Sequence, residues 1–202
     1  MREGMRYHFG FMELREAYDH CSYLARHHYE NFPVGRLVPR HMRPHVHAVY
    51  AFARTADDIA DEGYIDPRTL GGEAPAEALS EEERLEAMQA FQADLEACLA
   101  GHPVQPEHEW IFLPLADTIA RFDLPHSLFR DLLSAFSQDI VKRRYSDMDE
   151  VLDYCQRSAN PIGRLVLYLH GYRDEKIHTL SDHVCTGLQL ANFWQDVRRD
   201  IV

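Results

Sequence analysis

The sequence has few basic residues and lacks a long uncharged apolar run. Its 21 lysines and arginines stand against 33 aspartates and glutamates, for a formal net charge of -12. Because nucleic-acid backbones are bound by basic surfaces, this balance argues against a nucleic-acid partner, and a bound phosphate would need a metal bridge. No segment approaches the roughly 18 uncharged residues of a membrane span, and the charged N-terminal stretch lacks the apolar core of a signal peptide. We therefore expect a cytoplasmic protein, with any membrane association limited to peripheral contact.

Cysteines are also scarce, and none of them forms a Cys-x-x-Cys pair. The four cysteines are Cys21, Cys98, Cys155 and Cys185. This spacing suggests neither a structural zinc site nor a disulfide framework, as is typical of a reducing cytosol. His41, His45 and His47 raise the question of zinc, but His41 precedes Pro44, which can start a helix, and no cysteine is near. We assign these histidines ordinary surface or core roles.

Apolar residues recur at helical spacing along almost the whole chain, and no segment shows the alternation of a strand. The expected helices cover residues 14–25, the segment from Pro44 through the acidic residues near position 60, a segment from Ser80, and residues 107–122, 126–145, 150–172 and 180–202. Residues 63–79 are rich in Gly, Pro, Ala and Glu and read as a surface loop, after which Ser80 and Glu83 form a capping box. With 46% hydrophobic residues, the chain can bury one core. We therefore expect a single all-α domain over residues 1–202.

The second expected helix carries an unusual density of negative charge. Four acidic residues fall within six positions, namely Asp57, Asp58, Asp61 and Glu62. At about 100° per residue, Tyr50, Arg54, Asp57 and Asp61 share one side of the helix, next to its apolar stripe. Carboxylates one turn apart at the edge of a core repel each other and lose solvation, so they need cations nearby.

The end of the chain repeats this arrangement. Asn192, Asp196 and Asp200 are spaced i, i+4 and i+8, and Gln189 lies one turn earlier. A single Asp-x-x-x-Asp pair is usually a solvated helix face. Two such sets on apolar helices that face each other across a bundle suit Mg²⁺, which prefers a few carboxylates with water and phosphate oxygens. The sequence therefore predicts a cavity that binds a diphosphate through Mg²⁺.

Three segments carry a family resemblance. YAFARTADDIADEG and GLQLANFWQDVRRD resemble the two aspartate-rich motifs of the squalene and phytoene synthases, and YCQRSANPIGRL resembles their intervening Tyr-Cys motif. The resemblance runs from about Tyr18 to the last residue. It implies an isoprenoid-synthase helical bundle with a central cavity, and an enzyme that joins or rearranges isoprenoid diphosphates.

Within the family, ARHHYENFPVGRLVP and SANPIGRL are most similar to the bacterial hydroxysqualene synthases of the hopanoid pathway. That similarity implies ionisation of presqualene diphosphate, rearrangement of a cyclopropylcarbinyl cation and capture by water, with Mg²⁺ and without NADPH. The resemblance implies these metal ligands: Asp57, Asp61, Asn192, Asp196 and Asp200. It implies these substrate contacts: Arg54, Gln189 and His28 on the diphosphate, and Phe32 and Tyr50 shaping the hydrocarbon cavity. It also implies that Tyr154 is a catalytic residue facing the cation.

The chain departs from the family pattern in two places. Where condensing relatives carry a basic residue, this chain has Glu30, whose charge would repel a second diphosphate. Where relatives commonly read Val-Ala-Gly, it has Ser158, Ala159 and Asn160, followed by Pro161, which kinks the helix. Asn160 either positions the water that captures the cation or satisfies carbonyls freed by the kink, and the sequence leaves both roles open.

Several alternatives follow from the same residues. A condensing synthase that joins two prenyl diphosphates would share every metal ligand. Val202 follows Asp200 by two residues, so we expect the family's C-terminal helices to be absent, and an inactive truncated member is a further alternative. A ferritin-like di-iron bundle would need two Glu-x-x-His motifs, and only Glu175 with His178 fits, so we set it aside. The aromatic residues either pack the core or line a pocket where their rings stabilise a carbocation; they include Phe32, Phe52, Phe136 and Tyr168.

Overall fold

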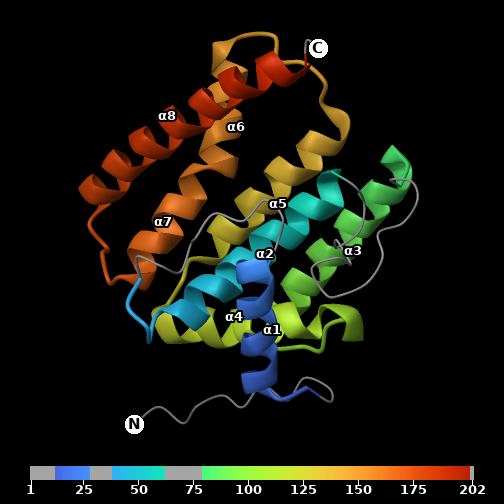
Figure 1. The fold of residues 1–202 in the computed structure, drawn as a ribbon, viewed down its shortest axis with the longest axis vertical. Coiled ribbons are helices and arrows are strands. Elements are labelled where there is room, and N and C mark those ends of the chain that lie inside the picture. Colours follow the sequence, from blue (N-terminus) through green and yellow to red (C-terminus); the bar gives the residue numbers. More distant parts are fainter. Residues whose placement is uncertain (1–11, 28–37, 62–78, 201–202) are drawn as a thin grey trace. The chain divides into compact units, whose positions relative to one another are not determined.

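The computed structural model describes residues 12–27, 38–61 and 79–200, with side chains through Gln195. These residues form helices and contain no strand (Figure 1). The helices are α1 (Leu14–His27), α2 (Arg43–Asp61), α3 (Glu81–Leu99), α4 (Glu109–Phe122) after a 3-10 turn (Pro106–His108), α5 (His126–Val141), α6 (Met148–Ser158), α7 (Asn160–Leu169) and α8 (Glu175–Asp200). The all-α prediction is confirmed. None of the described helices is long and apolar enough to cross a membrane.

The chain divides into two compact units, Met1–Asp123 and Leu124–Val202. The expectation of a single domain concerns both units together and stays a prediction. The expected loop over residues 63–79 lies almost wholly outside the described residues, which resume at Leu79.

The first unit is organised around α2, which packs against α1, α3 and α4. Phe52 of α2 lies 5.5 Å from Phe91 of α3 and 6.1 Å from Phe112 of α4, measured between ring centroids. All three rings are fully buried, so Phe52 serves the core. This packing holds α2, and the acidic residues on its last turns, against two neighbouring helices.

Polar contacts and caps complete this unit as the sequence indicated. Ser80 Oγ accepts a hydrogen bond from the backbone N–H of Glu83, and the Glu83 carboxylate accepts one from the backbone N–H of Ser80, which confirms the capping box. Two of the three histidines are buried: His47 Nδ1 lies 3.0 Å from Ser22 Oγ, and His45 lies 3.0 Å from Thr118 Oγ1. The third, His41, is exposed.

The second unit differs from the sequence expectation at the Tyr-Cys segment. Residues 150–172 do not form one kinked helix, because α6 ends at Ser158 and α7 begins at Asn160. Pro161 has no N–H to bond the preceding turn, so the helix is interrupted at Ala159, although the backbone of this one residue keeps right-handed helical angles. Beyond the break, Ile162 is exposed, while Leu165 and Leu169 are buried. Helix α5 likewise ends at Val141, before the predicted limit at position 145.

Candidate functional site

The last turns of α2 place their carboxylates in different environments. Arg54 Nη1 lies 2.6 Å from Asp57 Oδ2 and 3.9 Å from Asp58 Oδ1. The Asp57 side chain is 35% exposed, that of Asp58 only 7%, and Asp61 is exposed at the end of the helix. The two residues predicted as metal ligands therefore lie at the solvent edge of α2, while Asp58 points toward the core.

Arg54 stays charged in this environment. Burial by itself would lower the pKa of its guanidinium, but the carboxylate of Asp57, with Tyr50 and Asp58, raises the pKa instead. Burial raises the pKa of the Tyr50 hydroxyl, against the opposing effect of Arg54. The edge of α2 thus combines acceptor oxygens with one fixed positive charge and a neutral phenol, as predicted for this face.

A residue that the sequence did not point to holds the end of the acidic turn. Arg84 of α3 donates from Nη1 to the backbone carbonyls of Ala60, at 2.6 Å, and Asp61, at 3.1 Å. These carbonyls belong to the last turn of α2, where helical partners are missing. Arg84 therefore fixes the backbone that carries Asp61. This contact joins two helices, so no local sequence motif predicts it.

The second acidic motif lies on α8, which runs without a break through Gln189, Asn192, Asp196 and Asp200. An uninterrupted helix places residues at i, i+4 and i+8 along one side, as predicted. Gln189 is half-buried and Asn192 is exposed. The side chains of Asp196 and Asp200 lie outside the described part of the structure, and this motif belongs to a different unit from Asp57 and Asp61.

Tyr154 lies in an aromatic cluster next to this motif. Its ring centroid is 5.8 Å from that of Tyr145 and 5.7 Å from that of Phe193, the residue after Asn192. Its hydroxyl donates to Asp139 Oδ2 at 2.7 Å. Burial, followed by the charge of Asp139, raises the pKa of Tyr154, so the phenol stays protonated. The partner Asp139 comes from α5 and was not identified from the sequence.

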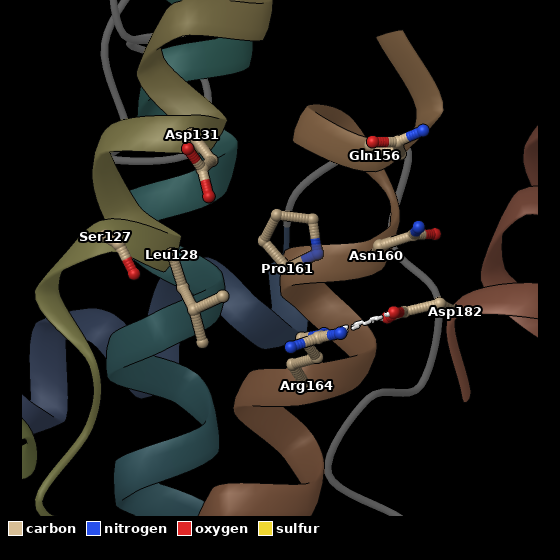
Figure 2. Close-up of a pocket in the computed structure, with 8 residues that line it drawn as sticks. All are labelled: Ser127, Leu128, Asp131, Gln156, Asn160, Pro161, Arg164 and Asp182. Carbon is tan, nitrogen blue, oxygen red and sulfur yellow. Dashed lines mark hydrogen bonds and ion pairs between the residues drawn. The ribbon is translucent and has the colours of Figure 1, made fainter. Parts of the chain in front are cut away.

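Asn160 lies at the start of α7, in a separate polar pocket of about 290 Å³ (Figure 2). The lining residues are Ser127, Leu128, Asp131, Gln156, Asn160, Pro161, Arg164 and Asp182. Asn160 is 7% exposed, and its Oδ1 accepts a hydrogen bond from Thr186 Oγ1 of α8 at 3.0 Å. Tyr154 is not among the lining residues, so the structure does not bring Tyr154 and Asn160 together in this pocket.

Two predicted substrate contacts, His28 and Phe32, lie outside the described residues, as does Glu30. Of the other aromatic candidates, Phe136 and Tyr168 are half-buried.

The α2 edge fits an open Mg²⁺ site. Asp57 and Asp61 supply hard carboxylate oxygens one turn apart, at a place with access to solvent. No group of three histidine, cysteine or acidic side chains that could hold a metal ion by itself occurs among the described residues. Mg²⁺ commonly binds through one or two carboxylates and completes its shell with water and substrate phosphates, so the donors present match this ion.

Comparison with known proteins gives one consistent result. A family described as squalene/phytoene synthase matches residues 24–201. Hydroxysqualene synthases of Rhodopseudomonas palustris and Sinorhizobium fredii are 38% and 37% identical to this chain over 86% and 88% of its length. The alignments cover 52% and 54% of those two proteins, so the chain spans about half the length of the curated relatives it matches.

A solved structure agrees with these sequence matches. The crystal structure of squalene synthase HpnC from Alicyclobacillus acidocaldarius superposes with a TM-score of 0.76 at 39% sequence identity. The superposition covers 93% of this chain and 64% of that one.

Proposed function

The chain belongs to the squalene/phytoene synthase family, and we propose that it serves the Mg²⁺-dependent conversion of presqualene diphosphate to hydroxysqualene in squalene and hopanoid biosynthesis. One observation carries this choice within the family. Three hydroxysqualene synthases are 34–38% identical to the chain, whereas a presqualene diphosphate synthase of Zymomonas mobilis is 31% identical and four phytoene synthases are 26–29% identical.

The metal ligands in this proposal come from both acidic motifs. Asp57 and Asp61 supply carboxylates from α2, and α8 supplies Asn192, Asp196 and Asp200. Held by these residues, Mg²⁺ would supply positive charge against the charge that develops on the diphosphate as the C–O bond breaks. The net charge of -12 supports a role for metal here, because carboxylates at the proposed site would repel a diphosphate unless a cation bridged them.

Arg54 has two tasks in the proposal. Its contact with Asp57 at 2.6 Å orients that carboxylate, and its permanent charge adds to the positive potential that the diphosphate meets. Gln189 and His28 donate hydrogen bonds to phosphate oxygens. Tyr50 is neutral and borders the apolar stripe of α2, so it serves with Phe32 as a wall for the hydrocarbon chain.

Tyr154 stabilises the carbocation through its ring. A cation over an aromatic face is attracted by the electron density of that face, and the attraction grows when water is excluded. The hydrogen bond from Tyr154 to the Asp139 carboxylate polarises the phenol and adds negative charge behind the ring. The neighbouring rings of Tyr145 and Phe193 extend the same surface.

The reaction balances without a reductant. The diphosphate departs with both electrons of the C–O bond, the carbon skeleton rearranges, and the oxygen of a water molecule forms the new C–O bond and releases a proton. Asn160 is the residue proposed to hold this water, because its buried amide lines a polar pocket large enough for water. Tyr154 does not line this pocket, so in the proposal the two residues act on the cation from different places.

The test is product analysis by mass spectrometry. Presqualene diphosphate with Mg²⁺ should give hydroxysqualene, with the same yield whether or not NADPH is added. Formation of squalene or phytoene-type hydrocarbons from two prenyl diphosphates would establish the condensing alternative. A chain of this length that releases no diphosphate under either condition would show that the remaining half of its relatives is needed for activity.

A further inference from the structure

Helices α7 and α8 approach each other most tightly at Gly163. A β-carbon placed on Gly163 would lie 2.5 Å from Cys185 Sγ and 2.5 Å from Ser181 Oγ, both on α8. Carbon atoms do not approach such atoms this closely, so a methyl group at this position requires both side chains to rotate away or the two helices to separate. At the present separation of α7 and α8, only the hydrogen atom of a glycine fits at this position.

Polar contacts tie the two helices together beside this point. Asn160 accepts a hydrogen bond from Thr186 at 3.0 Å. Arg164 donates two hydrogen bonds to the carboxylate of Asp182, from Nε to Oδ1 at 3.0 Å and from Nη2 to Oδ2 at 2.7 Å. Figure 2 shows the two side chains pointing toward each other. We call this set the α7–α8 joint, and it consists of Asn160, Gly163 and Arg164 on α7 with Ser181, Asp182, Cys185 and Thr186 on α8.

A glycine in the middle of α7 needs a physical reason. Glycine weakens a helix interior relative to alanine, because it adds backbone freedom to the unfolded chain. The close approach at the joint supplies that reason. Gly187 of α8 offers a contrast, since a β-carbon there would meet no atom within 4 Å.

Helix α8 extends from the joint toward the second acidic motif without a break. With a rise of about 1.5 Å per residue, Asn192 lies about 9 Å and Asp196 about 15 Å beyond Thr186 along the axis. An unbroken helix transmits a shift or tilt at the joint to these positions. Beyond the joint and next to Asn192, the ring centroid of Phe193 lies 5.7 Å from that of Tyr154.

We propose that Gly163 is a positioning residue: by holding α7 and α8 at the separation seen in the joint, it places the ligands of α8 where they can bind the Mg²⁺–diphosphate complex. The inference rests on the proposed role of Asn192 and Asp196 as metal ligands. It assigns Gly163 no contact with substrate. It also gives Asn160 and Arg164 a shared task, since both tie the same turn of α7 to α8.

Calorimetric titration with inorganic pyrophosphate in the presence of Mg²⁺ tests the functional side. Gly163→Ala should weaken Mg²⁺-dependent pyrophosphate binding by about tenfold or more, the range found when residues behind metal ligands are changed. Gly187→Ala is the matched control and should bind as the unaltered protein does. The triple variant Gly163→Ala, Ser181→Ala and Cys185→Ala removes both atoms that the new methyl group would meet, so it should regain most of the lost affinity.

A distance measurement tests the geometric side independently of binding. Nitroxide labels carried by non-natural amino acids at Met148 of α6 and Leu188 of α8, both more than half exposed, report the position of α8. Gly163→Ala should shift the distance distribution, and the triple variant should restore it. Gly187→Ala should leave it unchanged.

The outcomes separate this inference from the proposed function. An unchanged distance in Gly163→Ala, or a changed distance with unchanged pyrophosphate affinity, overturns the positioning role. An affinity loss that the triple variant does not relieve also overturns it, because the cause would not be the contact at the joint. If the unaltered protein binds no pyrophosphate with Mg²⁺, the proposed function fails for this chain, and the joint is then judged by the label distances alone.

Discussion

The hydroxyl of Tyr154 donates to Oδ2 of Asp139 at 2.7 Å, which joins the Tyr-Cys helix α6 to α5 within the second unit. The tyrosine was identified from its motif, while its partner was found only in the structure. A buried phenol bonded to a carboxylate stays protonated and presents a polarised ring, which is the state in which it can stabilise a cation.

Changing either partner of this hydrogen bond should alter a different property, the stability or the tyrosine pKa. Tyr154→Phe leaves the carboxylate of Asp139 without the phenol, which should lower the free energy of unfolding by about 1.5–3 kcal/mol. Asp139→Asn removes the charge that raises the pKa of Tyr154, so spectrophotometric titration should show a lower phenol pKa in this variant. Asp153→Asn, at a largely exposed carboxylate of the same helix α6, is the control. An unaltered tyrosine titration in Asp139→Asn would contradict the electrostatic coupling.

The acidic residues at the edge of α2 should prove essential for catalysis and dispensable for folding. Asp57→Asn should abolish Mg²⁺-dependent diphosphate release, and so should Asp196→Asn on α8. Circular dichroism should show the helical content nearly unchanged, because the Asp57 side chain is 35% exposed and its ion pair with Arg54 contributes little to stability. Full activity in either variant would remove that motif from the metal site.

Asn160 can be tested against its own hydrogen-bond partner. If Asn160 positions the water, Asn160→Ala should still release diphosphate but shift the products from hydroxysqualene toward other alcohols and eliminated hydrocarbons. Thr186→Val removes the hydroxyl bonded to Asn160 Oδ1 while leaving the amide in place. Both changes should lower stability by about 1 kcal/mol, yet only the first should change the product ratio. Equal product ratios in the two variants would show that Asn160 acts only through its hydrogen bond to α8.

The histidine on the buried side of α2 predicts how stability depends on pH. Burial, with the charges of Arg26 and Arg43, lowers the pKa of His47 from 6.5 to about 4. The unfolded chain therefore binds a proton at this residue at a higher pH than the folded protein does. The contribution of neutral His47 to the free energy of unfolding is fully present above pH 6.5. It is lost as the pH falls from about 6.5 toward 4.

Chemical denaturation at several pH values measures this effect. His47→Gln should flatten the loss of unfolding free energy over that interval, because the group that titrates differently in the two states is gone. His41→Gln, at an exposed histidine, should leave the slope as it is. A slope that is the same in His47→Gln and the unaltered protein would show that other groups cause the acid sensitivity.

Local patterns in the sequence were enough to predict the helices and the acidic motifs. The capping box at Ser80, the helix start near Pro44 and the spacing of residues on α8 depend only on neighbouring residues, and the structure shows each of them. The break at Ala159 was expected as a kink, because the rule for proline gives the position of a disturbance and not its extent.

Contacts between distant segments could not be predicted in this way. Three hydrogen bonds depend on how separate helices pack: Arg84 with the end of α2, Tyr154 with Asp139, and Thr186 with Asn160. The same holds for Gly163, whose reason is a neighbour about twenty residues away on α8. Hydrophobic periodicity indicates which face of a helix is buried, but it does not indicate which residues of other helices that face contacts.

The products formed from presqualene diphosphate test the proposed reaction most directly. With Mg²⁺ and no NADPH, the protein should release diphosphate and give hydroxysqualene, and chelation of Mg²⁺ should stop both. Addition of NADPH should change neither the rate nor the product. Hydroxysqualene formed without divalent metal, or a requirement for two molecules of prenyl diphosphate, would contradict the proposed reaction.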